Sequence, residues 1–247
     1  MHHFFVEPEA IEDKKIYIRG KDVNHIKNVL RMSPGDEISV TASDSVKEYR
    51  CRILNILPDV VECDLEFIKE EGNELPSKIY LFQGLPKSDK METIIQKCVE
   101  LGVYEIIPVE MKRSVMKIDE KKAASKTARY QAISEAAAKQ SKRSIIPGVS
   151  LPMSVKKALE YAKDLDVKLL PYELSQGFDK TREILNNINP GDSIGIFIGP
   201  EGGFDVKEVE EAKEAGFIPL TLGKRILRTE TAGMVVISWL NFLMEGR

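Results

Sequence analysis

The sequence predicts an α/β protein in which a small β-rich domain precedes a larger domain built on a mostly parallel sheet. Short strand-like runs dominate residues 1–70, whereas strand-like and helix-like runs alternate from residue 78 onwards. Such alternation produces a sheet whose two faces are covered by helices. Residues 71–77 are polar and contain glycine and proline, which is typical of a linker. We therefore expect domains at 1–70 and 78–247, joined at 71–77.

The first domain is predicted from its short strands. We expect strands at residues 4–6, 16–19, 37–41, 48–56 and 60–67, and one helix at 22–31. Many short strands at this spacing favour a barrel. Arg31, at the predicted end of the helix, has two interpretations, a partner for the helix dipole or a contact to RNA.

The second domain follows a different rhythm. We expect strands at residues 79–84, 104–109, 144–149, 167–172, 193–199 and 218–222. We expect helices at 87–101, 120–140, 154–163, 179–187, 206–215 and 231–243. Periodicity alone predicts an unknotted, Rossmann-like arrangement of these elements, because true knots are very rare.

Composition limits the classes of function. The 247 residues are 43% hydrophobic and 30% charged, as in globular proteins, and no apolar run has the length of a membrane span. The N-terminal residues carry acid where a signal peptide needs base, so we expect a cytoplasmic protein. The three cysteines are scattered and lack nearby histidines, which argues against a metal site.

Basic residues are concentrated in one part of the chain. Net charge is −3, yet residues 78–147 carry 14 basic and 8 acidic side chains. Most of the excess lies between Lys112 and Arg143, a segment we call the basic block. A basic patch on an acidic protein is typical of contact with a phosphate backbone. The alternative is a solvated helical face.

Two strands that end in glycine organise the C-terminal part. The first leads into Gly-Pro-Glu-Gly-Gly-Phe at 199–204, and the second into Leu-Gly-Lys-Arg-Ile-Leu-Arg-Thr-Glu-Thr-Ala at 222–232. Glycine lets a backbone approach a ligand closely, and Glu201 would repel a phosphate. The carboxyl edge of an α/β sheet, where both loops would meet, is a usual ligand site. Ordinary tight turns are the alternative.

These two motifs, in this order and spacing, resemble the signature of the RsmE family of SPOUT-class methyltransferases. The run from 25 to 36 also resembles the family's PUA-like N-terminal domain. The resemblance implies a PUA-like β-barrel followed by a trefoil-knotted SPOUT domain. It also implies methylation of uridine N3 in small-subunit ribosomal RNA, with S-adenosylmethionine as cofactor. The expected partners are that RNA, or the assembled small subunit, and a second copy of the chain, because SPOUT sites resemble composites of two subunits.

The resemblance and the loop positions together nominate site residues. As catalytic residues we expect Arg228, which would stabilise an anionic uridine, and Glu230, a base, a ribose contact or a residue that favours the start of the last helix. As cofactor-binding residues we expect Tyr172, Glu173, Gly199, Pro200, Glu201, Gly202, Gly203, Leu222, Gly223, Ile226, Leu227 and Thr229. As RNA contacts we expect Arg31, Lys87, Lys90, Lys97, Arg113, Ser114, Lys142 and Arg143. Lys90 and Lys97 have the alternative of simply covering the margin of a core.

Two positions depart from the family pattern. His3 stands where the family tends to have arginine, and Lys139 stands where it usually has glutamate. Two other functions remain as alternatives. A non-enzymatic ribosome-assembly factor would use only the barrel and the basic block. A Rossmann-type nucleotide-dependent enzyme is disfavoured, because no Gly-x-Gly-x-x-Gly follows the first strand of the α/β part. Affinity for S-adenosylmethionine would separate the three.

Overall fold

The computed structural model describes residues 1–70, 72–116, 120–173 and 177–245. It divides the chain into two compact units, Met1–Glu74 with Ala138–Ile146, and Leu75–Ala137 with Pro147–Arg247. The division after Glu74 falls inside the predicted linker, whose residue 71 lies outside the described residues. The return of residues 138–146 to the first unit was not predicted.

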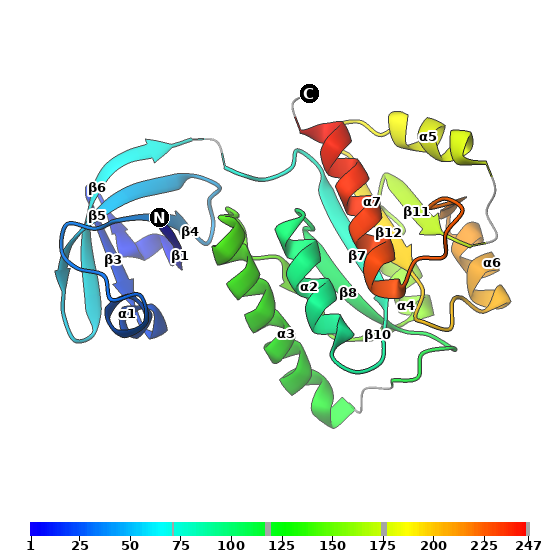
Figure 1. The fold of residues 1–247 in the computed structure, drawn as a ribbon, viewed down its shortest axis with the longest axis horizontal. Coiled ribbons are helices and arrows are strands. Elements are labelled where there is room, and N and C mark those ends of the chain that lie inside the picture. The colour runs from blue at the N-terminus through cyan, green and yellow to red at the C-terminus, as the bar shows by residue number, and fades with distance from the viewer. Residues whose placement is uncertain (71, 117–119, 174–176, 246–247) are drawn as a thin grey trace. The chain divides into compact units, whose positions relative to one another are not determined.

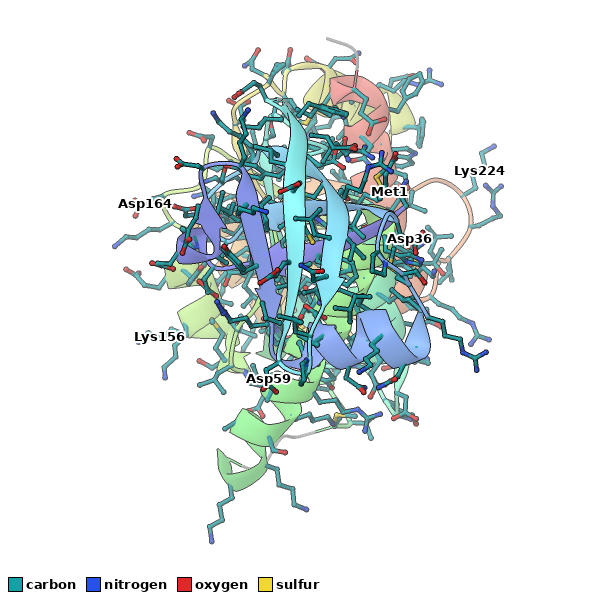
Figure 2. All side chains as sticks on the ribbon, turned by 90° about the vertical axis from the view of Figure 1, so that its left-hand side faces the viewer. Met1, Asp36, Asp59, Lys156, Asp164 and Lys224 are labelled. Carbon is teal, nitrogen blue, oxygen red and sulfur yellow. The ribbon has the colours of Figure 1, made fainter. Side chains whose placement is uncertain are left out.

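The first unit is a six-stranded sheet curled around one apolar core (Figure 1). Its strands are β1 (His2–Val6), β2 (Ile11–Glu12), β3 (Lys15–Arg19), β4 (Glu37–Ala42), β5 (Glu48–Ile56) and β6 (Val60–Lys69). They lie in the order β1-β4-β5-β6-β3-β2, with β1 parallel to β4 and the other neighbours antiparallel. Alternate residues such as Ile38 and Val40 face the core, as the period of a strand requires. Asp59 marks the β5–β6 turn (Figure 2).

The helix of this unit is shorter than predicted and partly irregular. A 3₁₀ turn, η1 (Pro8–Ala10), precedes it; α1 (Lys21–Asn24) then continues into a π-helical stretch, η2 (His25–Val29). The amide of Met32 donates to the carbonyl of Ile26 and closes the end of this helix. Arg31, just before Met32, has φ 55°. A positive φ is uncommon outside glycine, so the helix ends before Arg31, whose side chain is exposed.

The second unit contains one sheet in which every described strand pair is parallel. Its strands are β7 (Lys78–Gly84), β8 (Glu105–Glu110), β9 (Gly148–Val149), β10 (Met153–Ser154), β11 (Val167–Pro171), β12 (Ser193–Ile198) and β13 (Ile218–Leu220). Their order is β10-β8-β7-β12-β11-β13, and β9 also pairs with β8. The strand predicted at 144–149 shrinks to β9, because residues up to Ile146 are held in the first unit.

Helices cover both faces of this sheet (Figure 1). They are α2 (Lys90–Glu100), α3 (Glu120–Ser141), α4 (Val155–Tyr161), α5 (Phe178–Asn186), α6 (Val206–Glu214) and α7 (Thr229–Met244). Apolar residues of α4 and α6 share a cluster with Phe82 and Phe197 of the sheet. On the opposite face α7 packs on α2, and Gly233 brings α7 close to Leu81. Helix α2 begins three residues later than predicted, because Ser88 has φ 55°.

The parallel sheet brings its carboxyl-end loops to one edge. Strands β7, β12, β11 and β13 are neighbours in that order, so the loops that follow them are neighbours too. The amide of Tyr172, after β11, donates to the carbonyl of Leu220 at the end of β13, 3.0 Å away. The predicted fold class, a small β-rich domain followed by a helix-covered and mostly parallel sheet, is confirmed. Within the described residues no helix has both the length and the apolar character needed to cross a bilayer.

Candidate active site

The loop after β12, residues 199–204, folds tightly back on itself. A Cβ at Gly199 would lie 3.1 Å from the ring of Phe204, so glycine permits this close approach. Gly203 has φ 66° and open space where a side chain would be. Asp205 then starts α6 with a full capping box to Glu208. The loop is therefore fixed at both ends while its backbone faces open space at Gly203.

The loop after β13, residues 221–228, is held at its start and exposed beyond. The amide of Thr221 donates to the hydroxyl of Thr181 on α5, 3.2 Å away, and that hydroxyl donates to the Thr221 carbonyl. Gly223 has φ 108° with no atom within 4 Å of the place where a Cβ would stand, so its backbone is also accessible. Lys224 projects from this loop (Figure 2). Ile226, expected at the cofactor, has its side chain 79% exposed.

A short hydrogen-bonded chain joins the two loops. The Thr229 hydroxyl donates to the carbonyl of Gly199 at 2.6 Å and accepts from the Gln83 side-chain amide at 2.9 Å. Thr229 is the first residue of α7 and is buried. Its side chain therefore holds the loop at 199–204, and its one hydroxyl hydrogen is already donated within the protein.

Four alternating charges run from the first loop to the second. The ammonium of Lys90 lies 2.9 Å from Glu201 and 3.5 Å from Glu230, and Glu230 lies 3.9 Å from Arg228. Partial burial by itself raises the pKa of Glu201, but hydrogen bonds from Lys90 and from backbone amides outweigh burial and hold that pKa below its ordinary value. The bond to Glu201 likewise raises the pKa of Lys90. Lys90 was expected to contact RNA; in the structure its charge is directed to these carboxylates.

The segment after β8 contacts the loop at residues 199–204 and the start of α6. Arg113 donates to the carbonyl of Gly202 at 3.1 Å, and Lys112 pairs with Asp205 at 2.9 Å. The hydrogen bond from Lys112 is the largest cause of a lowered pKa at Asp205. Ser114 is buried, and its hydroxyl accepts from the amide of Met111. Ser114 thus closes its own turn, and its burial disfavours the expected contact with RNA.

Several cations of the basic block form ion pairs with carboxylates of the protein, and two of these cations are exposed. Besides the Lys112 pair, Arg129 pairs with Glu92 and Lys139 pairs with Asp22. Residues 117–119 of the block lie outside the described residues. The block is therefore a weaker attractant for phosphate than its sequence predicts.

Arg143 is the clearest departure among the expected RNA contacts. It is 3% exposed, and its guanidinium is bound by the carboxylate of Glu74 within the first unit. Glu74 also accepts from the amides of Ser144 and Ile145, at 2.8 and 3.3 Å. This burial and the pairing with Glu74 disfavour the expected contact between Arg143 and RNA, which stays a prediction. Lys142 beside it is exposed, with φ 57°.

The other nominated residues are exposed or half-buried, except Pro200, which is buried. Lys97 is engaged by Glu100 at 2.8 Å, and the Lys87 amide donates to Glu201 while its side chain is exposed. Tyr172 is half-buried, with its ring edge-on to Phe204, and Glu173 is exposed. The remaining cofactor positions, Pro200, Leu222 and Leu227, lie within the two loops.

The two departures from the family pattern both lie in the first unit. His3 is buried and bonded through Nδ1 to the Ser39 hydroxyl at 2.8 Å, and burial lowers the pKa of His3 to about 4. Lys139 forms an ion pair with both carboxylate oxygens of Asp22. His3 is therefore a neutral packing residue at ordinary pH and does not supply the positive charge of an arginine.

Sequence reasoning missed Gln83 and Glu74. A signal for Gln83 was present, since it is an amide near the end of an otherwise apolar and aromatic strand run, 79–85. No comparable signal exists for Glu74, which lies in a polar linker and finds its partner 69 residues away. Among the residues that the structure describes, no three His, Cys, Asp or Glu side chains gather as a metal site.

Comparison with known proteins identifies the family. The sequence matches the RNA methyltransferase domain over residues 73–241 and the RNA methyltransferase PUA domain over 18–64. Ribosomal RNA small subunit methyltransferase E of Bacillus subtilis is 39% identical over 251 residues, which cover 99% of this chain and 98% of that protein.

Two solved structures resemble the chain along its length. Ribosomal RNA small subunit methyltransferase E from Neisseria gonorrhoeae, bound to S-adenosyl methionine, has a TM-score of 0.86 and 32% identity, covering 99% of this chain and 98% of that one. A methyltransferase from Legionella pneumophila in complex with the same cofactor has a TM-score of 0.84 and 30% identity, covering 97% and 96%. The chain belongs to the ribosomal RNA small subunit methyltransferase E family.

Proposed function

We propose that this protein transfers the methyl group of S-adenosylmethionine to N3 of a uridine in small-subunit ribosomal RNA. Family membership supports the reaction class, since the relatives are ribosomal RNA small subunit methyltransferases and two similar structures contain the cofactor. The observation that carries the proposal is the meeting of two glycine loops at one sheet edge, linked by the Thr229–Gly199 hydrogen bond.

The residues at this edge fit S-adenosylmethionine. Open backbone at Gly203 and Gly223 can receive the edges of an adenine and a ribose, which need amides and carbonyls as partners. The carboxylate of Glu201 in the first loop disfavours a phosphate, whereas the cofactor carries none. The cofactor would lie between the loops, against the backbone of Gly199, Leu222 and Leu227.

Arg228 has the properties of an anion stabiliser. When bound, the cofactor supplies a methyl group on a sulfonium, which needs an aligned nucleophile. Uridine N3 becomes nucleophilic only when its proton leaves, and the resulting charge spreads onto O2 and O4. A guanidinium beside those oxygens stabilises that charge. The Arg228 side chain is 79% exposed, so it is available to an incoming base.

Glu230 is better suited to positioning than to acting as an isolated base. Its carboxylate lies 3.5 Å from Lys90 and 3.9 Å from Arg228, so two cations flank it. This arrangement orients the Arg228 guanidinium at the mouth of the loop. We assign Glu230 the role of holding Arg228, and the acceptor of the N3 proton is bulk water or hydroxide.

We further propose a homodimer that acts in the cytoplasm on ribosomal RNA or on the assembled small subunit. Helix α7 carries Phe242, 84% exposed, and the adjacent loop carries the exposed Ile226. A second copy of the chain that covers these side chains would complete a composite site. The trefoil knot of the family remains part of this proposal.

One set of measurements tests the function. Isothermal titration calorimetry with S-adenosylmethionine should show binding, and methylation mapping on rRNA from a deletion strain should show one uridine that has lost its N3 methyl group. RNA binding without cofactor binding would identify an assembly factor instead. If the protein binds the cofactor but the rRNA of the deletion strain has lost none of its N3-methyluridines, the proposed substrate is ruled out.

A further inference from the structure

The chain of hydrogen bonds beneath the two loops has a fixed direction. A threonine hydroxyl carries one hydrogen, and in Thr229 that hydrogen is given to the Gly199 carbonyl, 2.6 Å away. The hydroxyl oxygen can then only accept, and its donor is the Gln83 side-chain amide at 2.9 Å. The sequence of donors therefore runs from Gln83 through Thr229 to Gly199.

The orientation of Gln83 follows from its second bond. Its Nε2 also donates to the carbonyl of Gly84 at 3.0 Å. Turning the amide over would place its oxygen against that carbonyl and leave Thr229 without a donor. Gln83 is fully buried, and its Oε1 has no hydrogen-bond partner among the described residues. A buried, unpaired acceptor is costly and calls for an explanation beyond packing.

The chain joins three elements that carry the site. Gln83 lies near the end of β7 and pairs in register with Ile198, the residue before Gly199. Thr229 begins α7 and is flanked in sequence by Arg228 and Glu230. Moving Thr229 therefore moves the carbonyl of Gly199 in one loop and the two charged residues of the other.

We propose that Gln83 is a positioning residue which, through Thr229, fixes the cofactor loop relative to the start of α7. This inference deepens the proposed function and rests on it. Gln83 does not touch the cofactor; it sets the direction of the Gly199 carbonyl and the place of Arg228. Loss of these hydrogen bonds should therefore both weaken cofactor binding and slow methyl transfer.

The alternative is an ordinary buried hydrogen bond that only stabilises the fold. The second unit offers a matched control, Ser134, which is fully buried and donates to the carbonyl of Pro147 at 2.7 Å. Ser134→Ala removes a buried hydrogen bond of nearly the same length, and Ser134 is distant in sequence from both loops. It should lower thermal stability and leave the cofactor dissociation constant unchanged.

The test compares Thr229→Val, Thr229→Ser, Gln83→Leu and the double variant Gln83→Leu/Thr229→Val with that control. Valine keeps the branched shape of threonine and removes the hydroxyl, whereas serine keeps the hydroxyl. Calorimetry should show affinity for S-adenosylmethionine about tenfold weaker in Thr229→Val and Gln83→Leu, as one lost buried hydrogen bond allows. Serine should restore most of the affinity. The double variant should be no weaker than the weaker single variant, because both break one chain.

Hydrogen exchange of the cofactor-free protein gives a second readout. In Thr229→Val the amides of 199–204 and 229–232 should exchange faster, while those near Ser134 should not. Wild-type cofactor affinity in stable Thr229→Val and Gln83→Leu variants would overturn the inference alone. A wild-type protein that binds no S-adenosylmethionine would overturn the proposed function, and with it the proposed effect of the Gln83–Thr229–Gly199 hydrogen bonds on cofactor binding.

Discussion

Replacement of Arg228 by alanine should abolish most of the catalytic rate without destabilising the protein. The structure separates the two effects. The Arg228 side chain is 79% exposed, and its nearest charged partner is Glu230 at 3.9 Å. Its side chain makes no capping bond to α7, although it occupies the N-cap position. Losing such an exposed pair costs about 0–1 kcal/mol of stability.

The expected loss in transition-state stabilisation is larger. Removing a donor that faces a developing anion costs about 2.7–4 kcal/mol, or roughly 10²–10³ in rate. Stabilising the anionic uridine more than the neutral one is what raises the rate. Arg228→Lys should recover only part of it, because an ammonium lacks the planar fork that spans two acceptors. Higher pH should partly rescue Arg228→Ala, since hydroxide then helps to remove the N3 proton.

Single-turnover methylation with saturating cofactor, measured across pH, is the assay. Arg225→Ala is the matched control, because Arg225 is an exposed cation three residues earlier in the same loop. The control should retain the rate constant while losing a little RNA affinity. A near-wild-type, flat pH profile in Arg228→Ala would remove this residue from the mechanism. Loss of cofactor affinity and thermal stability along with the rate would mean that Arg228 only holds the loop.

Three further outcomes follow from other sites. Gly202→Val should weaken cofactor binding, because its Cβ would lie 3.1 Å from the Cβ of Arg113 and the loop would have to shift. Unchanged cofactor affinity in a folded variant would place the pocket elsewhere. Lys142→Asn keeps a residue type that tolerates positive φ, and it should lower the slope of log affinity for RNA against log salt concentration by about 0.7–0.9. Arg143→Met should leave that slope unchanged and cost about 3–5 kcal/mol of stability, because it leaves Glu74 unpaired. A changed slope in Arg143→Met and an unchanged slope in Lys142→Asn would contradict this assignment. His3 has a pKa of about 4 in the folded protein against 6.5 when unfolded. Its contribution to stability is therefore fully present above pH 6.5, and stability should fall by up to about 3 kcal/mol as the pH drops towards 4. Denaturant titrations should show a weaker dependence of stability on pH in His3→Asn than in the wild type, and the same dependence in both proteins would contradict this role of His3.

The sequence predicted the parts of the molecule that depend on local pattern. Apolar runs located every strand of the parallel sheet except β10, although only the last two residues of the strand predicted at 144–149 form β9, and the glycine loops suggested the candidate site. The extent of the strand at 144–149 was mispredicted, and the burial of Arg143 was not foreseen, for one reason. Residues 138–146 are held in the first unit by Glu74, and a contact across 69 residues leaves no periodic trace in the sequence.

The charged residues show the same limit of local reasoning. Positive charge was counted along the chain, but attraction to RNA depends on which cations remain unneutralised in the fold. Lys90, Lys112 and Arg129 are each within 3 Å of a carboxylate, although the sequence gives no sign of these pairs. A count of basic residues therefore overstated the basic block.

We expect the exposed cations of the loop after β13 to contribute to RNA recognition. Lys224, Arg225 and Arg228 lie within five residues and are all exposed, next to the backbone that would hold the cofactor. On a chain of net charge −3, a small positive cluster at the site attracts phosphate locally, while the acidic surface elsewhere disfavours non-specific binding. Because few phosphates are then neutralised, the salt dependence of binding should be shallow. On the proposed function, we therefore expect selection of the target uridine to rest more on the shape of the RNA around that base than on total electrostatic attraction.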